Sequence, residues 1–193
     1  LRPDLLNPYH LKQLRQAAWY GAVSMADALG TQQPKNITTI KPEGTSSKVM
    51  STTEGIHRPS GQYIFNNITF SKHDPLVDIL SSADYETRNN PLQPDGVLVK
   101  FPVEWPKEAA LDESAITQLE RYKLVMSHYV DQNASVTISY DIGEKDSIIK
   151  WLLDNWDFYV GVSFLPKQTT KGTHPYLPQE IVDETTYKEY TKG

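Results

Sequence analysis

Hydrophobic positions recur at helical spacing through residues 8–29, which predicts a long amphipathic helix. The positions that set its apolar face are Leu11, Leu14, Ala18, Tyr20, Ala22, Met25, Ala26 and Leu29. Gly30 follows, and glycine commonly adopts the left-handed conformation that ends a helix. The same spacing predicts two further helices, one over residues 112–131 with Asp112 as its cap and one over residues 144–156.

Shorter runs that are rich in β-branched and aromatic residues predict about five strands. These runs cover residues 37–40, 63–71, 96–103, 134–140 and 159–165, and the prolines at positions 102 and 166 are expected to end the third and the last. The first run is uniformly apolar, as in a parallel strand that is covered on both faces. Because strands and helices largely alternate, we expect an α/β fold with about five mostly parallel strands.

The segments between these runs predict smaller elements. A short helix is expected over residues 75–83, with Asp74 as its cap. Residues 84–95 are polar and are expected to form a surface loop. The polar, proline-spaced tail at residues 167–193 is compatible with a short helix over residues 178–190.

The turn at residues 41–48, KPEGTSSK, carries the candidate chemistry. Pro42 cannot donate a ladder hydrogen bond and Gly44 permits a tight turn, so the preceding strand should end here. Three hydroxyl residues that favour a helix start follow, namely Thr45, Ser46 and Ser47. The free N–H groups of a helix over residues 46–52 would bind an anion, and the lysines at either end of the turn would add positive charge. The spacing is not that of a Walker loop, so a turn that only caps a helix is the alternative.

The loop at residues 53–59 contains glycine and proline and follows this turn closely in sequence. We expect both segments to line one pocket, with these residues around it: Pro42, Lys48, Gly55, Ile56, His57 and Pro59. His57 either touches the ligand of this pocket or only packs, and the sequence leaves both readings open.

Composition excludes several classes of function. The formal net charge of −5 argues against a non-specific nucleic-acid binder, and no run of about 18 apolar residues is present to span a membrane. The 193 residues contain no cysteine, which excludes thiol chemistry and cysteine-based zinc sites in this chain. The five histidines lack the spacing of a metal site, so none is expected. A single domain, or a fragment of one, is expected over residues 1–193. The charged residues Glu120, Arg121 and Lys123 are expected to form a solvated helix face.

Four blocks of this sequence resemble ribonucleotide reductases, above all the adenosylcobalamin-dependent (class II) triphosphate reductases. TTIKPEGTSSKVMSTTEGIHRP at residues 38–59 resembles the TT-x-KP-x-GT-x-S and TPG-x-H-x-P stretches of that family. DQNASVTISY at residues 131–140 is similar to its D-N-A-V-S-V-T strand entry, and residues 151–166 resemble its L-x-x-x-W-D and G-x-S-F-L-P segment. Residues 178–181 resemble its P-x-E-E-I block, so the resemblance covers most of the chain.

The resemblance implies a cytoplasmic piece of a reductase that forms the second half of a ten-stranded α/β barrel. It implies that the substrate phosphates are held by these residues: Glu43, Gly44, Thr45, Ser46 and Ser47. The implied partners are a ribonucleoside triphosphate or diphosphate, and either the missing N-terminal catalytic half or a second copy of the chain. Neither a membrane nor direct nucleic-acid contact is implied.

Family chemistry uses a cysteine thiyl radical and a reducing cysteine pair, so this cysteine-free chain is expected to contribute no catalytic residue. Adenosylcobalamin is implied for the complete enzyme, with none bound by this chain alone. Where the radical-transfer class carries two adjacent tyrosines, this chain has Phe164 and Leu165, which favours the cobalamin class. The alternatives are a non-catalytic nucleotide-binding or assembly module with a reductase-like fold, or an unrelated α/β domain.

Overall fold

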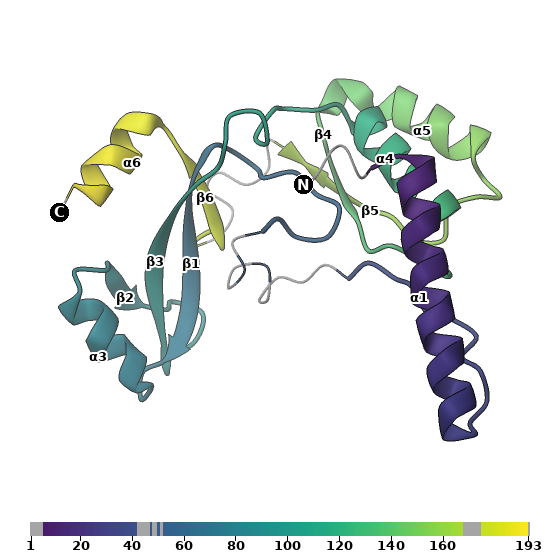
Figure 1. The fold of residues 1–193 in the computed structure, drawn as a ribbon. Coiled ribbons are helices and arrows are strands. Elements are labelled where there is room, and N and C mark those ends of the chain that lie inside the picture. The colour runs from purple at the N-terminus through teal and green to yellow at the C-terminus, as the bar shows by residue number, and fades with distance from the viewer. Residues whose placement is uncertain (1–5, 42–46, 48–49, 51, 168–174, 193) are drawn as a thin grey trace. The chain divides into compact units, whose positions relative to one another are not determined.

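The computed structural model describes residues 6–41, 47, 50, 52–167 and 175–192 (Figure 1). The chain divides into two compact units. The first comprises Leu1–Arg58 with Glu113–Lys167, and the second comprises Pro59–Asp112 with Gln168–Gly193. Each unit is described by itself.

The first unit packs three helices around a short parallel sheet. Its elements are α1 (Pro8–Leu29), α4 (Ala115–His128), β4 (Thr137–Tyr140), the 3₁₀ turn η2 (Ile142–Glu144), α5 (Lys145–Asp154) and β5 (Ser163–Pro166). Helix α4 packs against α1, α5 and β4, and β4 pairs in parallel with β5. Its core consists mainly of apolar side chains from these elements: Leu11, Ile56, Leu119, Tyr122, Val125, Ile138, Ile148 and Trp151.

The predicted helix over residues 8–29 is confirmed with the same bounds. The side chain of Asn7 caps it by accepting the His10 N–H at 3.0 Å, and Gly30 ends it with a left-handed φ of 63°. For α4 the predicted cap was wrong, because the Ser114 hydroxyl, not Asp112, accepts the Thr117 N–H at 3.1 Å.

The apolar face of α1 is covered at its beginning and uncovered at its end. Leu11 lies in the core, whereas Met25 and Leu29 on the same face are 60% and 67% exposed. Figure 1 shows α1 extending past the other elements of its unit. The helix therefore presents apolar surface that the described part of its own unit does not cover.

The strand expected over residues 37–40 is reduced to a single parallel bridge between Ile40 and Ala134. The N–H groups of Ile37 and Thr38 donate to the carboxylate of Asp131, at 2.7 and 2.9 Å. These two amides are therefore satisfied by a side chain, and among the described residues the bridge at Ile40 is isolated.

The second unit is a four-stranded antiparallel sheet with the order β2-β3-β1-β6. Its elements are β1 (Tyr63–Ser71), α3 (Pro75–Ser82), β2 (Thr87–Asn89), β3 (Gly96–Glu104), β6 (Gln179–Val182) and α6 (Glu184–Thr191). The expectation of about five mostly parallel strands is therefore wrong, because among the described residues only β4 and β5 form a parallel pair of strands. The predicted cap of α3 is confirmed, since Asp74 accepts the Leu76 N–H at 3.0 Å.

Proline 102 continues β3 instead of ending it. The N–H of Lys100, two residues earlier, donates to Glu86 at 3.0 Å and so points away from β1. The backbone nitrogen of Pro102 points to the same side of β3 as the Lys100 N–H. Pro102 lies past Val99, which is the last residue of β3 that pairs with β2. Its missing N–H is therefore at a free edge and breaks no ladder bond.

Aromatic packing joins α6 to this sheet. The Phe65 ring lies 4.9 Å from that of Tyr190, and the Tyr63 ring lies 5.0 Å from that of Tyr187. Figure 1 shows α6 at one end of the long antiparallel pair of strands β1 and β3, and α3 at the other end. Part of the segment expected to be polar tail or helix thus forms an edge strand and a packed helix.

Within the described ranges, no helix combines the length and the hydrophobicity needed to cross a lipid bilayer.

Candidate functional site: a cavity beside the hydroxyl-rich turn

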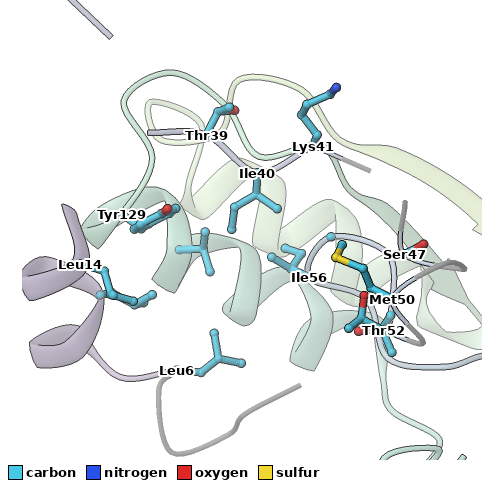
Figure 2. A pocket seen from close by; sticks show the side chains of 14 residues that line it. Leu6, Leu14, Thr39, Ile40, Lys41, Ser47, Met50, Thr52, Ile56 and Tyr129 are labelled. Atoms are coloured by element: carbon cyan, nitrogen blue, oxygen red, sulfur yellow. The ribbon is translucent and has the colours of Figure 1, made fainter. Parts of the chain in front are cut away.

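The first unit contains a cavity of about 580 Å³ (Figure 2). Apolar side chains line one part of it, namely Leu6, Leu11, Leu14, Ile40, Met50, Ile56, Val125 and Tyr129. The rest is lined by Gly55 and by polar residues from both sides of the predicted turn: Thr39, Lys41, Ser47, Thr52 and Thr53. In Figure 2 the ammonium group of Lys41 points away from the other lining side chains. The cavity lining thus combines apolar side chains with several hydroxyl groups.

Of the predicted phosphate-binding residues, only Ser47 is among those described. Glu43, Gly44, Thr45 and Ser46 lie outside the described residues. Ser47 lines the cavity and is 1% exposed.

The hydroxyl of Ser47 is a buried polar atom without a partner in the part of the chain that the structure describes. Its Oγ accepts or donates no hydrogen bond there, whereas its carbonyl oxygen accepts the Thr52 N–H at 2.9 Å. Leaving a buried hydroxyl unsatisfied costs about 1–3 kcal/mol. Such atoms are rare in native proteins, and each calls for an explanation.

Of the predicted pocket-lining residues, Gly55 and Ile56 line the same cavity as Ser47. Pro42 and Lys48 lie outside the described residues. Pro59 belongs to the second unit, and His57 follows the two lining residues directly.

The loop that carries Gly55 and Ile56 is held by several side-chain bonds. Arg121 donates to the Ile56 carbonyl at 3.1 Å and forms an ion pair with Glu113. Both ring nitrogens of His57 are also engaged, with the Glu54 carbonyl at 2.8 Å and with the Thr137 N–H at 2.9 Å. The cavity wall on this side is therefore fixed from α4 and from β4.

The solvated face expected for residues 120, 121 and 123 is confirmed only for Glu120, which is exposed, whereas Arg121 and Lys123 are partly buried. The Arg121 side chain is largely buried in its ion pair. Glu120 accepts the indole N–H of Trp151 at 2.6 Å, and Lys123 donates to Asn155 at 2.6 Å. These charged groups bind neighbouring segments to α4. Helical spacing alone does not predict such partners, because they lie far away in sequence.

Gly55 is a position that requires glycine. Its φ is +53°, and a Cβ placed on it would lie 3.1 Å from the backbone oxygen of Lys41. We expect Gly55→Ala to lower the free energy of unfolding by about 1–2 kcal/mol, because alanine is strained in this conformation. Urea denaturation followed by circular dichroism measures the change.

The matched control is Gly143→Ala, since a Cβ at Gly143 has nothing within 4 Å. That variant should be as stable as the wild type or slightly more stable. Equal stability of both alanine variants would contradict the strained geometry assigned to Gly55.

A second polar centre lies at Asp131, which sequence reasoning did not single out. Hydrogen bonds from the Thr38 and Ile37 N–H groups and from Arg15 lower the pKa of Asp131 from 3.8 to about 2. The carboxylate thus holds the start of the segment that leads into the cavity, and its partners Ile37 and Thr38 lie more than 90 residues away in sequence. A pattern read along the chain could not have found this contact.

In the parts of the chain that the structure describes, no three His, Cys, Asp or Glu side chains are grouped so that they could hold a metal ion.

Comparisons with known proteins agree on one enzyme family. The chain is 31% identical over 163 residues to a probable adenosylcobalamin-dependent ribonucleoside-triphosphate reductase of Dictyostelium discoideum, which covers 81% of this chain and 21% of that protein. It is 29% identical over 182 residues to the adenosylcobalamin-dependent ribonucleoside-triphosphate reductase of Lactobacillus leichmannii, covering 88% of this chain and 24% of that protein. The protein of the same name from Euglena gracilis is 26% identical over 169 residues. No family model matches the chain.

The fold points the same way. A crystal structure of a B12-dependent (class II) ribonucleotide reductase superposes with a TM-score of 0.82, covering 98% of this chain and 27% of that one, at 23% sequence identity. The chain spans about a quarter of the length of the relatives it matches. It is thus a homologue of one segment of the adenosylcobalamin-dependent ribonucleoside-triphosphate reductases, which confirms the resemblance seen in its sequence.

Proposed function

We propose that this chain is a piece of a ribonucleotide reductase that binds the phosphates of the substrate ribonucleotide and completes the active-site barrel. The observation that carries the proposal is the buried, unpartnered hydroxyl of Ser47, which lines a cavity beside a turn of phosphate-binding composition. The homology to triphosphate reductases over most of the chain supports a ribonucleoside triphosphate as the ligand.

The chemistry of the cavity suits a nucleotide better than a bare anion. The lining includes hydroxyl groups, and the Ser47 hydroxyl has no hydrogen-bond partner among the described residues, whereas a phosphate oxygen would supply one. The lining also includes apolar side chains such as Leu14 and Ile40, which are available to pack against a sugar or a base. A pocket with an apolar wall and a few convergent polar groups is typical of small-molecule sites.

Completion of a barrel is supported by an open sheet edge. Strand β5 pairs with β4 on one side, and no other strand of the described residues joins its other side. Unpaired strand edges expose N–H and C=O groups that another strand can bind. The uncovered apolar face at the end of α1, with Met25 and Leu29, points to the same conclusion. We infer that other parts of a reductase cover these surfaces. The chain spans only about a quarter of the length of the relatives it matches, so such parts are available in them.

The reduction itself is proposed for the complete enzyme. The chain contains no cysteine, and the thiol chemistry implied by the resemblance has to come from elsewhere in that enzyme. Adenosylcobalamin would supply the radical there. No observation favours the non-catalytic alternative.

Ser47→Ala tests the phosphate site. Isothermal titration of CTP, ATP and CDP should show about tenfold weaker binding of the triphosphates to the variant, because one charge-assisted hydrogen bond is lost. The same substitution should leave the stability unchanged or raise it by about 1 kcal/mol, since it removes an unsatisfied buried hydroxyl.

The control is Ser135→Ala, which removes an exposed hydroxyl outside the cavity lining. It should bind nucleotides like the wild type. Equal triphosphate affinity for the wild type and Ser47→Ala would contradict the proposed site, and tighter binding of CDP than of CTP would contradict the triphosphate assignment.

A further inference from the structure

The outer edge of β4, the edge away from β5, has its amides satisfied without a neighbouring strand. Successive alternate N–H groups on this edge donate to three different acceptors: Ser135 to the Ile40 carbonyl (3.1 Å), Thr137 to Nε2 of His57 (2.9 Å) and Ser139 to Oε1 of Gln118 (3.0 Å). A strand in this place would offer a ladder of carbonyl oxygens. The imidazole of His57 therefore takes the place of one backbone carbonyl that a paired strand would supply.

This arrangement requires one protonation state of His57. Because Nε2 accepts the Thr137 N–H, it carries no proton, and Nδ1 is then the nitrogen that donates to the Glu54 carbonyl at 2.8 Å. An imidazolium has no acceptor atom, so protonation would break the bond to Thr137. The two bonds together define a neutral ring with its proton on Nδ1.

The position of the ring links this bond to the cavity. His57 directly follows Gly55 and Ile56, which line the cavity, and Thr137 is the first residue of β4. The bond between His57 and Thr137 therefore fastens the cavity wall to the sheet. Arg121 holds the same loop through the Ile56 carbonyl, at a different atom.

We propose that His57 is a positioning residue, which in its neutral Nδ1–H form fixes the Gly55–Ile56 wall of the nucleotide cavity against β4. The inference rests on the proposed function for the identity of the ligand, but not for the tautomer or the hydrogen bonds. Charged groups that surround the loop are Glu54 and Arg58 on the loop itself, Glu113 before α4 and Arg121 on α4. The flanking β4-side residues Val136 and Ile138 carry no charge.

Nuclear magnetic resonance of the wild-type chain tests the tautomer directly. Ring ¹⁵N shifts of His57 should show a protonated Nδ1 and a bare Nε2 while the ring is neutral. The Thr137 amide should be protected from exchange with solvent, because its N–H is bonded to Nε2. An Nε2–H tautomer, or a Thr137 amide that exchanges as fast as an unprotected one, would overturn the proposal.

Two variants separate positioning from mere packing. His57→Ala should speed Thr137 amide exchange about tenfold and weaken CTP binding, because the acceptor is gone. His57→Gln places an amide oxygen near the position of Nε2, so it should restore Thr137 protection. If His57→Gln exchanges as fast as His57→Ala, the proposal fails.

The two proposals fail in different ways. A wild-type chain that shows the Nδ1–H tautomer and a protected Thr137 but binds no CTP would support the role of His57 and refute the proposed function. A chain that binds CTP equally well with histidine and alanine at position 57 would refute the positioning role and leave the proposed function standing.

Discussion

Replacing Leu119 by alanine is expected to lower the free energy of unfolding by about 3–4 kcal/mol. Leu119 is 0% exposed on α4, the helix that packs against α1, α5 and β4. Truncating a fully buried leucine removes its transfer free energy and leaves a void in a close-packed core. Urea denaturation followed by far-ultraviolet circular dichroism measures the loss.

Leu153→Ala is the matched control, because Leu153 on α5 is 67% exposed. Its substitution should change the stability by less than about 0.5 kcal/mol. If both alanine variants lose the same stability, α4 is not at the centre of the core and the fold described for the first unit is wrong.

The second large effect is expected at Asp131. Its carboxylate accepts the N–H groups of Ile37 and Thr38 and pairs with Arg15 at 2.5 Å. Asp131→Ala leaves these donors without their partner, so we expect a loss of about 2–3 kcal/mol in the free energy of unfolding. Thermal and urea unfolding of the variant provide the measurement.

The contribution of Asp131 should also depend on pH. Its folded-state pKa is lowered from 3.8 to about 2, so the stabilisation is fully present above about pH 4 and is lost as the pH falls through 4 toward 2. Its partner Arg15 is half-exposed, so solvent screens their interaction. We therefore expect the pH-dependent contribution of Asp131 to the free energy of unfolding to be about 1–2 kcal/mol.

Asp131→Asn keeps an acceptor oxygen but cannot titrate. The acid limb of its stability curve should therefore be flatter than that of the wild type. An identical acid limb in both proteins would show that another group controls the acid response.

Local signals were sufficient for α1 and α3. The bounds of α1 followed from apolar spacing together with Gly30, and α3 followed from Asp74. Capping bonds span only two or three residues, so a sequence contains nearly all the information that they need. The misplaced cap of α4 shows the limit, because Asp112 and Ser114 are both suitable and only the structure distinguishes them.

Strand pairing was the part that local signals could not supply. The run over residues 63–71 was correctly predicted to be a strand, but its partners are β3 and β6, and β6 lies more than 100 residues later. Alternation of apolar residues does not reveal whether a neighbour runs parallel or antiparallel. Strand β2, only three residues long and polar, has no strand signal and is held by its pairing with β3.

The candidate site shows the same division. A hydroxyl-rich turn and a glycine loop were predicted to share a pocket, and the structure places Ser47, Gly55 and Ile56 on one cavity. The groups that hold this site in place, Arg121 and Asp131, act through partners far away in sequence. Their roles depend on the folded arrangement and could not be predicted from spacing.

The central claim is that the turn and the loop form a phosphate-binding cavity for a ribonucleoside triphosphate. Amide chemical shifts of the ¹⁵N-labelled chain during a titration with CTP test it most directly. We expect saturable shifts at cavity residues such as Thr39, Ser47 and Ile56, and little change in the antiparallel unit. No shifts at the cavity, or saturable shifts located mainly in the unit of residues 59–112, would contradict the claim.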